Sequence, residues 1–344
     1  MKDRIIGKVG GNAYEFLRAR YDLNDPKTLV LATTSVFNIA NQKGEVKTII
    51  NLSKSNNIRY INKFFKQVNI KLAKENEFVC CLETISARKE RSQFGKIPVL
   101  GSLFFAIEFI FLRAIPKIWG LKKIYFGITK GRNRLISKAE ILGRLVSCGF
   151  EIVDYRSYDG LLFVVSKKMK EPEPNQNVSY GPLFKTKRLG KNGKLIEVYK
   201  LRTMHPYAEY LQDYVLKLSG YAETGKPAND FRLTRWGGFF RRYWLDELPQ
   251  LINVCKGEMK LVGVRPVTPR YFEDIPKDLQ ELRLKQKPGC IPPYVFLNRK
   301  STVESVLQAE REYLIKKAAH PYFTDTKYFF RAIFNIIFKG KRSA

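Results

Sequence analysis

Two adjacent acids, Asp246 and Glu247, are the residues of this chain best placed to do chemistry, and they lie in the run WLDELPQLINVC. Residues 248–255 favour a short helix, with Pro249 in its first turn and Gly257 ending it. The acids then lie at the helix N-terminus, where a carboxylate stays ionised and phosphate oxygens find free N–H groups. An ionised carboxylate there can attack phosphorus and form an acyl phosphate. The alternative interpretation is that the two acids only cap the helix.

Four basic residues are candidates to surround the acid pair, namely Lys200, Arg202, Arg241 and Arg265. Arginine forks are suited to bidentate recognition of a diphosphate. The alternative is solvated surface charge, which we expect for the neighbouring Arg242. The residue types therefore predict a site in which Lys and Arg side chains bind a phosphate group next to a carboxylate.

Two elements must position these residues. Residues 181–204 predict a β-hairpin with the turn Lys-Asn-Gly-Lys at 191–194, because Asn-Gly supplies the positive φ angles of a tight turn. Lys200 and Arg202 then lie on the second strand of the hairpin. The short helix after the acids is the second element.

The order and spacing of three blocks resemble those of the bacterial sugar transferases, the monotopic polyprenyl-phosphate phosphoglycosyltransferases. The blocks are GPLFKTKRLGKNGKLIEVYKLRTM, RLTRWGGFFRRYWLDELPQLINVCKGEMKLVGVRPVTP and KPG, and the resemblance covers residues 180–289. It implies that Asp246 and Glu247 form a catalytic dyad, with Mg²⁺ bound beside Asp246. It also implies that Lys200, Arg241 and Arg265 belong to the phosphate site.

The same resemblance implies transfer of a phosphosugar from a nucleoside-diphosphate sugar, expected to be a UDP-sugar, to polyprenyl phosphate. Asp246 would attack the β-phosphate and hold a covalent aspartyl-phosphosugar intermediate, while Glu247 would assist proton removal or orient the lipid phosphate. Such a reaction initiates lipid-linked glycan or exopolysaccharide synthesis. A catalytically inactive membrane-associated binding module in glycan assembly is the alternative.

Three departures from the family pattern bear on this expectation. The polar linker 171–179 occupies the place where the family has a re-entrant membrane helix. Trp244 replaces the serine that precedes LDELPQ, which we expect to alter packing. PGCIPPYVFL at 288–297 replaces the usual PGITGWAQV, which we expect to affect recognition of the nucleotide or the acceptor.

The first half of the chain alternates predicted strands and helices. Residues 136–168 are vaguely similar to the C-terminal end of class I methyltransferase-like domains, but no G-x-G-x-x-G follows the first predicted strand at 28–37. A scaffold or regulatory domain is therefore favoured over cofactor binding. The predicted fold class is an α/β N-terminal domain (1–170) followed, after the linker, by an α+β phosphoglycosyltransferase domain (180–344) with membrane-associated amphipathic helices.

Two apolar segments predict contact with an anionic membrane surface. Residues 98–121 are rich in Phe and Ile, and Glu108, Arg113 and Pro116 interrupt them, which favours a helix that enters one leaflet and turns back. Residues 326–342 mix Phe and Ile with Lys and Arg, as interfacial helices do. We expect a monotopic or peripheral protein at the cytoplasmic face of the bacterial inner membrane, although an ordinary buried helix would also fit 98–121.

Composition limits the other classes of function. The 344 residues carry a formal charge of +30, which requires an anionic partner. Both halves are basic and neither shows a recognition-helix pattern, so no nucleic-acid partner is predicted. Five scattered cysteines and two histidines argue against a disulfide framework, a structural zinc site and a Ser-His-Asp triad. Homo-oligomerisation is left open.

Overall fold

The computed structural model describes residues 1–344 except 93–96, 98–99, 118–119, 173–179, 221–228 and 341–344. The chain divides into two compact units, which are residues 1–180 with 205–218 and residues 181–204 with 219–344. Residues 205–218, which follow the predicted hairpin, thus belong with the first unit. Most of the predicted linker 171–179 lies outside the described residues, so the linker and the predicted domain limits stay predictions.

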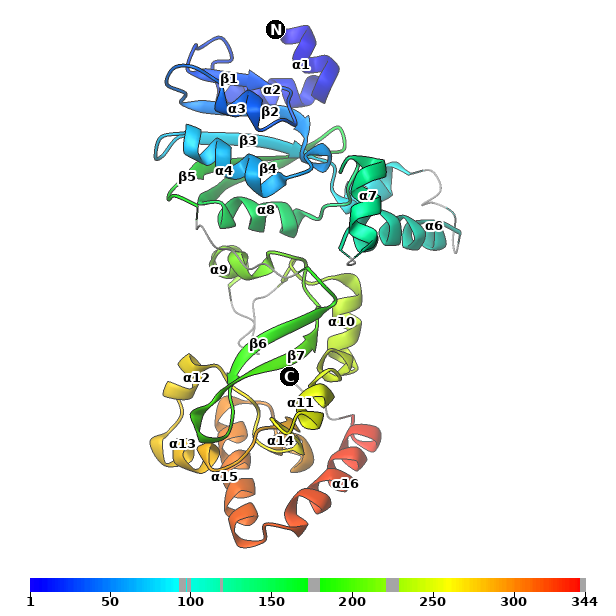
Figure 1. The fold of residues 1–344 in the computed structure, drawn as a ribbon, viewed down its shortest axis with the longest axis vertical. Coiled ribbons are helices and arrows are strands. Elements are labelled where there is room, and N and C mark those ends of the chain that lie inside the picture. Colours follow the sequence, from blue (N-terminus) through cyan, green and yellow to red (C-terminus); the bar gives the residue numbers. More distant parts are fainter. Residues whose placement is uncertain (93–96, 98–99, 118–119, 173–179, 221–228, 341–344) are drawn as a thin grey trace. The chain divides into compact units, whose positions relative to one another are not determined.

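A five-stranded sheet of order β1-β2-β3-β5-β4 forms the centre of the first unit (Figure 1). Its first three strands are parallel, and β5 lies antiparallel between β3 and β4. The predicted strand at 28–37 is shorter than expected and ends at Leu31. At Thr33 the backbone N–H and carbonyl bond to the Asn51 side-chain amide instead of to the backbone of a neighbouring strand. The strands are β1 (Thr28–Leu31), β2 (Thr48–Lys54), β3 (Glu77–Leu82), β4 (Phe150–Tyr158) and β5 (Leu161–Lys168).

Helices cover both faces of this sheet, because alternate residues of a strand point to opposite faces. Ile50 and Val79 pack with Ile5 and Leu17 of the N-terminal helices, whereas Phe78 on the other face contacts Phe65 at a ring distance of 5.7 Å. The sheet is therefore buried on both sides. The helices of this part are α1 (Lys2–Val9), α2 (Gly11–Arg20), α3 (Phe37–Ala40), α4 (Ile61–Lys71) and α5 (Ile85–Arg91).

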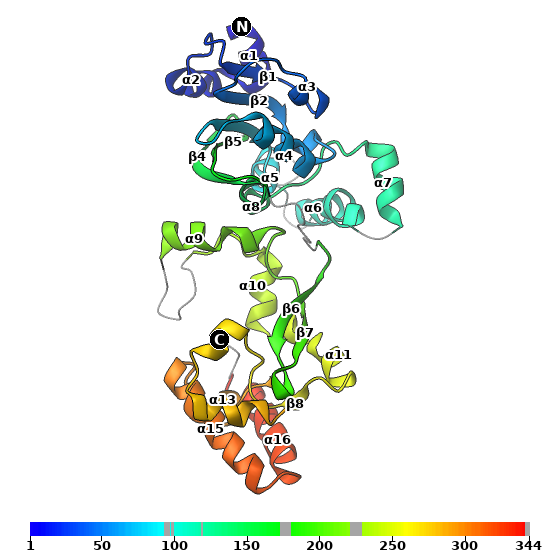
Figure 2. The same ribbon diagram turned by 60° about the vertical axis from the view of Figure 1, so that its left-hand side comes forward.

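The predicted helix 137–148 is confirmed as α8 (Lys138–Ser147), and Ser137 caps it by accepting a hydrogen bond from the Glu140 N–H. The apolar segment 98–121 contains α6 (Leu100–Phe109), followed by irregular helical turns at 110–117, and α7 (Leu121–Thr129) comes next. Figure 2 shows α6 and α7 to one side of the sheet. Leu103, Phe111 and Ile128 are exposed there.

The second unit begins with the predicted hairpin, which is β6 (Leu183–Leu189) and β7 (Leu195–Leu201). Asn192 and Gly193 have positive φ angles of 57° and 74°, as the Asn-Gly turn predicts. A second pair of strands, β8 (Lys260–Val262) and β9 (Gly289–Ile291), is parallel. The helices are α10 (Arg235–Arg242), α11 (Gln250–Cys255), α12 (Pro269–Glu273), α13 (Lys277–Leu284), α14 (Pro293–Phe296), α15 (Val303–Ala319) and α16 (Phe323–Phe338).

The core of the second unit joins its last helices to the β8 strand. Phe296 stacks on Tyr328 at 4.6 Å and meets Tyr313 edge to face at 5.5 Å. The opposite side of α16 exposes Phe334 and Phe338. Among the described residues, no helix combines the length and the apolar character needed to cross a membrane. Membrane association of the amphipathic segments stays a prediction.

Candidate active site

The acid pair lies in one turn of 3₁₀ helix, residues Leu245–Glu247, directly before α11. Pro249 precedes the first residue of α11, and Gly257 follows its end with a φ of 71°. The local prediction for these residues is therefore confirmed in outline. The acids are adjacent in sequence, but the side chains around them differ.

Glu247 is held by three side chains. The Lys200 ammonium lies 2.9 Å and the Arg265 guanidinium 3.1 Å from Oε1, and the Gln250 amide donates to Oε2 at 3.0 Å. Burial alone would raise the pKa of Glu247, but the charges of Lys200 and Arg265 outweigh it and hold this pKa below its ordinary value. Glu247 is thus a fixed anion that positions two cations.

Asp246 is half-buried, and within the described residues its carboxylate has no side-chain hydrogen bond or ion pair. Burial, followed by the negative charge of Glu247, raises the pKa of Asp246 above its ordinary value, although Lys200 and Arg241 oppose the shift. A carboxylate that is desolvated and bonded to no other side chain is a stronger nucleophile than one held by ion pairs, as Glu247 is. Of the two acids, Asp246 is the one available to react.

Arg241 is positioned by contacts between α10 and the end of the hairpin. Its Nε donates to Thr203 Oγ1 at 3.1 Å, and Thr234, the N-cap of α10, donates to the Thr203 carbonyl at 2.9 Å. Helix and hairpin approach closely at Gly237, where an added Cβ would lie 2.1 Å from the Thr203 oxygen. This packing requires glycine and places Arg241 where its charge acts on Asp246.

Arg202 is placed differently from the other predicted cations. Its Nε donates to the Gly181 carbonyl at 3.0 Å, and its guanidinium lies 5.0 Å from the centre of the Phe184 ring. The structure thus brings Lys200 and Arg265 to Glu247 and Arg241 within electrostatic reach of Asp246, whereas these contacts of Arg202 lie at the base of the hairpin. A role for Arg202 in binding substrate stays a prediction.

Three residues that support the site were not predicted from the sequence. Gln250 binds Glu247 from the next helical turn, an i,i+3 spacing that could have been read from LDELPQ. Thr203 fixes Arg241. Fully buried Asn253 accepts from the Tyr199 N–H at 3.0 Å and donates to the Glu197 carbonyl at 2.8 Å, which fastens α11 to the strand that carries Lys200. Only tertiary contacts identify Thr203 and Asn253.

Trp244 immediately precedes the acid turn and has a left-handed φ of 62°. A bulky residue rarely adopts this conformation, and the strain costs about 1–3 kcal/mol. Trp244 packs against a buried cluster that includes Tyr294 and Val295. These two residues belong to the segment 288–297 that departs from the family pattern, so both departures contribute to one packed region.

The residues at the site fit a magnesium ion only in part. In the described portion of the chain, no group of three or more His, Cys, Asp or Glu side chains could hold a metal. Mg²⁺ is commonly bound through one or two carboxylates together with substrate phosphates and waters. Asp246, whose carboxylate is not bonded to another side chain, fits that mode, whereas Glu247 is already occupied by cations.

Comparison with known proteins identifies the second half of the chain. The family model described as bacterial sugar transferase matches residues 175–339. This half belongs to the bacterial sugar transferase family. The acid pair, its cations and the three supporting residues all lie within the matched region of the sugar transferase. The match does not reach the first 174 residues, and the vague similarity of residues 136–168 to methyltransferase-like domains stays a prediction.

Several relatives carry related names. The chain is 40% identical over 164 residues to the UDP-glucose:undecaprenyl-phosphate glucose-1-phosphate transferase of Escherichia coli, covering 46% of this chain and 30% of that protein. It is 38% identical over 119 residues to the undecaprenyl-phosphate galactose phosphotransferase of Salmonella typhimurium, covering 32% and 24%. The galactosyl transferase CpsE of Streptococcus agalactiae is 40% identical over 113 residues, covering 32% and 24%. The chain thus spans less than a third of the length of each of these relatives.

Proposed function

We propose that the second unit transfers a sugar 1-phosphate from a nucleoside-diphosphate sugar to polyprenyl phosphate and so begins the assembly of a lipid-linked polysaccharide. One observation carries the proposal: Asp246 is desolvated and not bonded to another side chain, while its neighbour Glu247 fixes Lys200 and Arg265 beside it. The names of relatives that are 38–40% identical support undecaprenyl phosphate as the acceptor. A UDP-sugar is the proposed donor, as the name of the Escherichia coli relative suggests.

The proposed reaction has two displacements at one phosphorus. A carboxylate oxygen of Asp246 attacks the β-phosphorus of the donor, and the bond from that phosphorus to the bridging oxygen breaks. The nucleoside monophosphate leaves, and the sugar 1-phosphate remains on Asp246 as an acyl phosphate. An oxygen of polyprenyl phosphate then attacks the same phosphorus and displaces the carboxylate, giving a polyprenyl diphosphate sugar.

The cations stabilise the charge that gathers on phosphate oxygens during both displacements. Arg265 and Lys200 share the Glu247 carboxylate, and a guanidinium with five N–H donors and an ammonium with three are both suited to binding a diphosphate as well. Arg241 is fixed through Nε, which leaves its terminal nitrogens for phosphate oxygens. Because Glu247 holds Lys200 and Arg265 in place before substrate arrives, little reorganisation is needed at the moment of reaction.

Magnesium is part of the proposal. Asp246 would hold the ion through one carboxylate oxygen, with the donor diphosphate supplying further ligands. When bound, Mg²⁺ would neutralise diphosphate charge and make the nucleoside monophosphate a better leaving group. The other carboxylate oxygen of Asp246 would serve as the nucleophile.

Access of a lipid acceptor to the site is supported by apolar side chains beside the acids. Tyr243, Leu248 and Leu251 are each about half exposed, and they flank the acid turn in sequence. The exposed aromatic side of α16 and the α6–α7 segment are further candidates for contact with an anionic membrane. Deletion of residues 98–121 should weaken pelleting with anionic vesicles, and a variant that pellets as well as the wild type would contradict the role of that segment.

The direct test is release of nucleoside monophosphate from a panel of nucleotide sugars, with undecaprenyl phosphate and Mg²⁺ present. We expect release from one or a few UDP-sugars, dependence on Mg²⁺, and loss of release in Asp246→Asn. Binding to membranes without release from any donor would instead support a non-catalytic binding module.

A further inference from the structure

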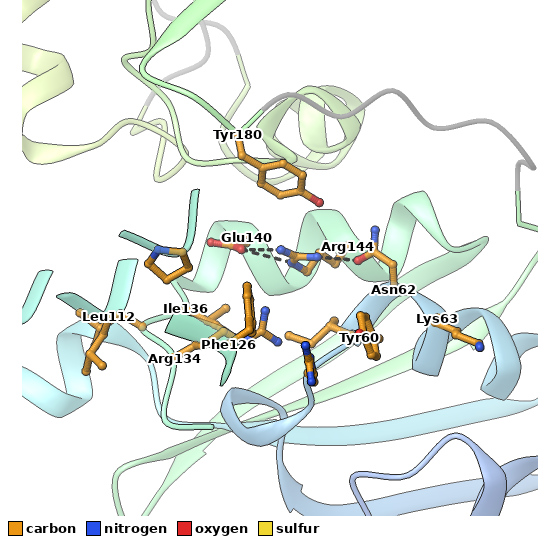
Figure 3. A pocket seen from close by; sticks show the side chains of 14 residues that line it. Tyr60, Asn62, Lys63, Leu112, Phe126, Arg134, Ile136, Glu140, Arg144 and Tyr180 are labelled. Carbon is orange, nitrogen blue, oxygen red and sulfur yellow. Dashed lines mark hydrogen bonds and ion pairs between the residues drawn. The ribbon is translucent and has the colours of Figure 1, made fainter. Parts of the chain in front are cut away.

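The first unit contains a cavity of about 550 Å³, and every residue that lines it belongs to that unit (Figure 3). Its walls are the loop and first turn of α4, residues 134–136, helix α8, Phe126 of α7, and Tyr180, with Leu112 and Pro116 at one side. The α4 loop follows β2, and Ile136 pairs with Thr84 just after β3. The cavity therefore lies at the carboxyl ends of parallel strands, where open α/β sheets bind ligands.

Hydrogen bonds hold these walls together. Asn56 is almost fully buried, and its amide nitrogen donates to the carbonyls of Glu83 and Arg134 at 2.8 Å each. Its amide oxygen accepts from the Glu83 N–H at 2.8 Å, and its own carbonyl accepts from the Arg134 N–H at 3.1 Å. One side chain thus fastens the loops after β2 and β3 to the segment before α8. This part of the wall is preformed.

The cavity carries an excess of positive charge. Arg59, Lys63, Arg134 and Arg144 line it together with a single acid, Glu140. Glu140 pairs with Arg144, whose Nη2 lies 2.8 Å from Oε1. In the described residues no carboxylate forms an ion pair with the other three cations, of which Arg59 and Lys63 are exposed, so the cavity presents a net positive charge to a ligand.

Arg134 and Arg144 differ in how many of their guanidinium N–H groups have hydrogen-bond partners. Arg144 donates to Glu140, to Asn62 Oδ1 at 2.6 Å and to the Tyr207 hydroxyl at 3.3 Å. Arg134 binds the Ile58 carbonyl, but its Nε is buried and has no hydrogen-bond partner in the described part of the chain. Burial and the nearby Arg144 charge lower the pKa of Arg134 to about 10. A bound anion beside this guanidinium would oppose the lowering of its pKa.

The backbone adds a further attraction for an anion. Residues 59–63, which include the first turn of α4, line the cavity, and no side chain caps this helix of 11 residues. The N–H groups of its first turn have no intrahelical acceptors, and the helix dipole favours negative charge at this end.

Aromatic rings define the remainder of the binding surface. Tyr60, Phe126 and Tyr180 line the cavity, and Figure 3 shows Tyr180 facing the Glu140–Arg144 pair from the opposite wall. The Arg59 guanidinium lies 5.2 Å from the Tyr60 ring and 5.5 Å from the Phe126 ring. Flat rings beside arginines suit stacking of a planar base.

We propose that this cavity binds a nucleoside phosphate, with the phosphate on Arg134, Arg59 and the first turn of α4, and the base among Tyr60, Phe126 and Tyr180. Its volume lies in the range usual for small-molecule sites. The excess of cations disfavours S-adenosylmethionine, whose sulfonium is itself positive. The site is distinct from the acid pair, and the proposal does not depend on the proposed function.

Photoaffinity labelling of the full-length chain with 5-azido-UDP and 8-azido-ADP tests the location directly. We expect labelled peptides from residues 59–63, 126–136 or 180. The nucleotide concentration that gives half-maximal labelling of these peptides should rise about tenfold in Arg134→Gln, since a charge-assisted hydrogen bond is lost. Arg132→Gln, which removes an exposed arginine that does not line the cavity, should leave it unchanged.

Two further arms keep the test decisive. Arg59→Gln changes an exposed side chain and should also weaken labelling, so misfolding of Arg134→Gln cannot by itself account for the result. Unlabelled UDP or ADP should compete, whereas S-adenosylmethionine, inorganic phosphate and dioctanoyl phosphatidic acid should compete poorly. Labelling confined to residues 181–289, or competition by the phosphatidic acid alone, would overturn the proposal. Labelling of 181–289 reports on the donor site of the proposed function instead.

Discussion

Each unit places an acid and a cationic side chain together at the start of a helix, but the two arrangements are bonded differently. In the first unit, Glu140 and Arg144 are 5% and 8% exposed and lie 2.8 Å apart. In the second, Glu247 is held in a similar way by Lys200 and Arg265, yet the adjacent Asp246 is bonded to no described side chain. The comparison separates carboxylates that hold structure from one that is kept available for reaction.

The largest expected effect follows from removing the available carboxylate. Asp246→Asn should lower turnover by at least about a thousandfold, because the proposed nucleophile is lost. The variant should be no less stable at neutral pH: the raised pKa of Asp246 means that its charged form is disfavoured by folding. Turnover and thermal unfolding at pH 7 measure both effects.

Asp274→Asn is the matched control, since Asp274 is an exposed acid of the same unit. It should leave turnover unchanged. Comparable losses in the two variants would remove the distinction between Asp246 and an ordinary surface acid.

Glu247→Gln should reduce turnover by about a hundredfold, because Lys200 and Arg265 lose the group that fixes them. It should also lower the free energy of unfolding at pH 7 by about 1–3 kcal/mol. The pKa of Glu247 is lowered in the folded protein, so this stabilisation is present above the ordinary glutamate pKa and is lost as pH falls through the lowered value. Urea unfolding at pH 7 and in acid should therefore show a difference between variant and wild type only at the higher pH.

Arg265→Gln should raise the KM for the nucleotide sugar about tenfold, since one charge-assisted contact to phosphate is lost. Arg242→Gln is the control, because Arg242 is exposed and its described contact is with the Tyr243 ring at 6.0 Å. If steady-state kinetics show equal changes in KM for both variants, Arg265 contributes no more to substrate binding than an exposed arginine does.

The acid limb of the pH–rate profile reports on Asp246. Because burial and the charge of Glu247 raise the pKa of Asp246, activity should fall with decreasing pH at a value above that of an ordinary aspartate. Glu247→Gln removes the neighbouring negative charge that raises the pKa of Asp246. The acid limb of the activity that remains in this variant should therefore move to lower pH. A limb that moves to higher pH would show that Glu247 does not act on Asp246 through its charge.

Arg144→Gln should change stability without changing catalysis. The substitution leaves Glu140 buried beside a neutral side chain, which should destabilise the first unit by about 3–5 kcal/mol. Turnover per folded molecule should stay at the wild-type value. A loss of turnover at temperatures where the variant is folded would show that this ion pair serves the reaction as well as the fold.

Local sequence signals predicted much of this structure. Ser137 caps the start of α8, and the Asn192–Gly193 turn joins β6 to β7. Both features were predictable because they depend on short-range backbone chemistry. The acid pair was found through its spacing in LDELPQ. Strand β1 was predicted too long, since Asn51, 18 residues away from Thr33, ends its ladder.

The residues that position the site were harder to find, because their partners are distant in sequence. Asn253 binds the backbone of Tyr199 across 54 residues, and Arg241 binds Thr203 across 38 residues. Arg202 lies only two positions from Lys200 and has the same charge, yet it binds the Gly181 carbonyl. Because Arg202 is close to Lys200 in sequence and carries the same charge, both were predicted to bind substrate. The described contacts of Arg202 do not involve the acid pair.

Intact-mass spectrometry of the protein mixed with its nucleotide sugar and Mg²⁺, without lipid acceptor, tests the central claim most directly. We predict a mass increase equal to one sugar phosphate, mapped by peptide sequencing to Asp246 and discharged when polyprenyl phosphate is added. An active enzyme that shows no adduct under rapid quenching, or an adduct on any other residue, would contradict the assignment of Asp246 as the nucleophile.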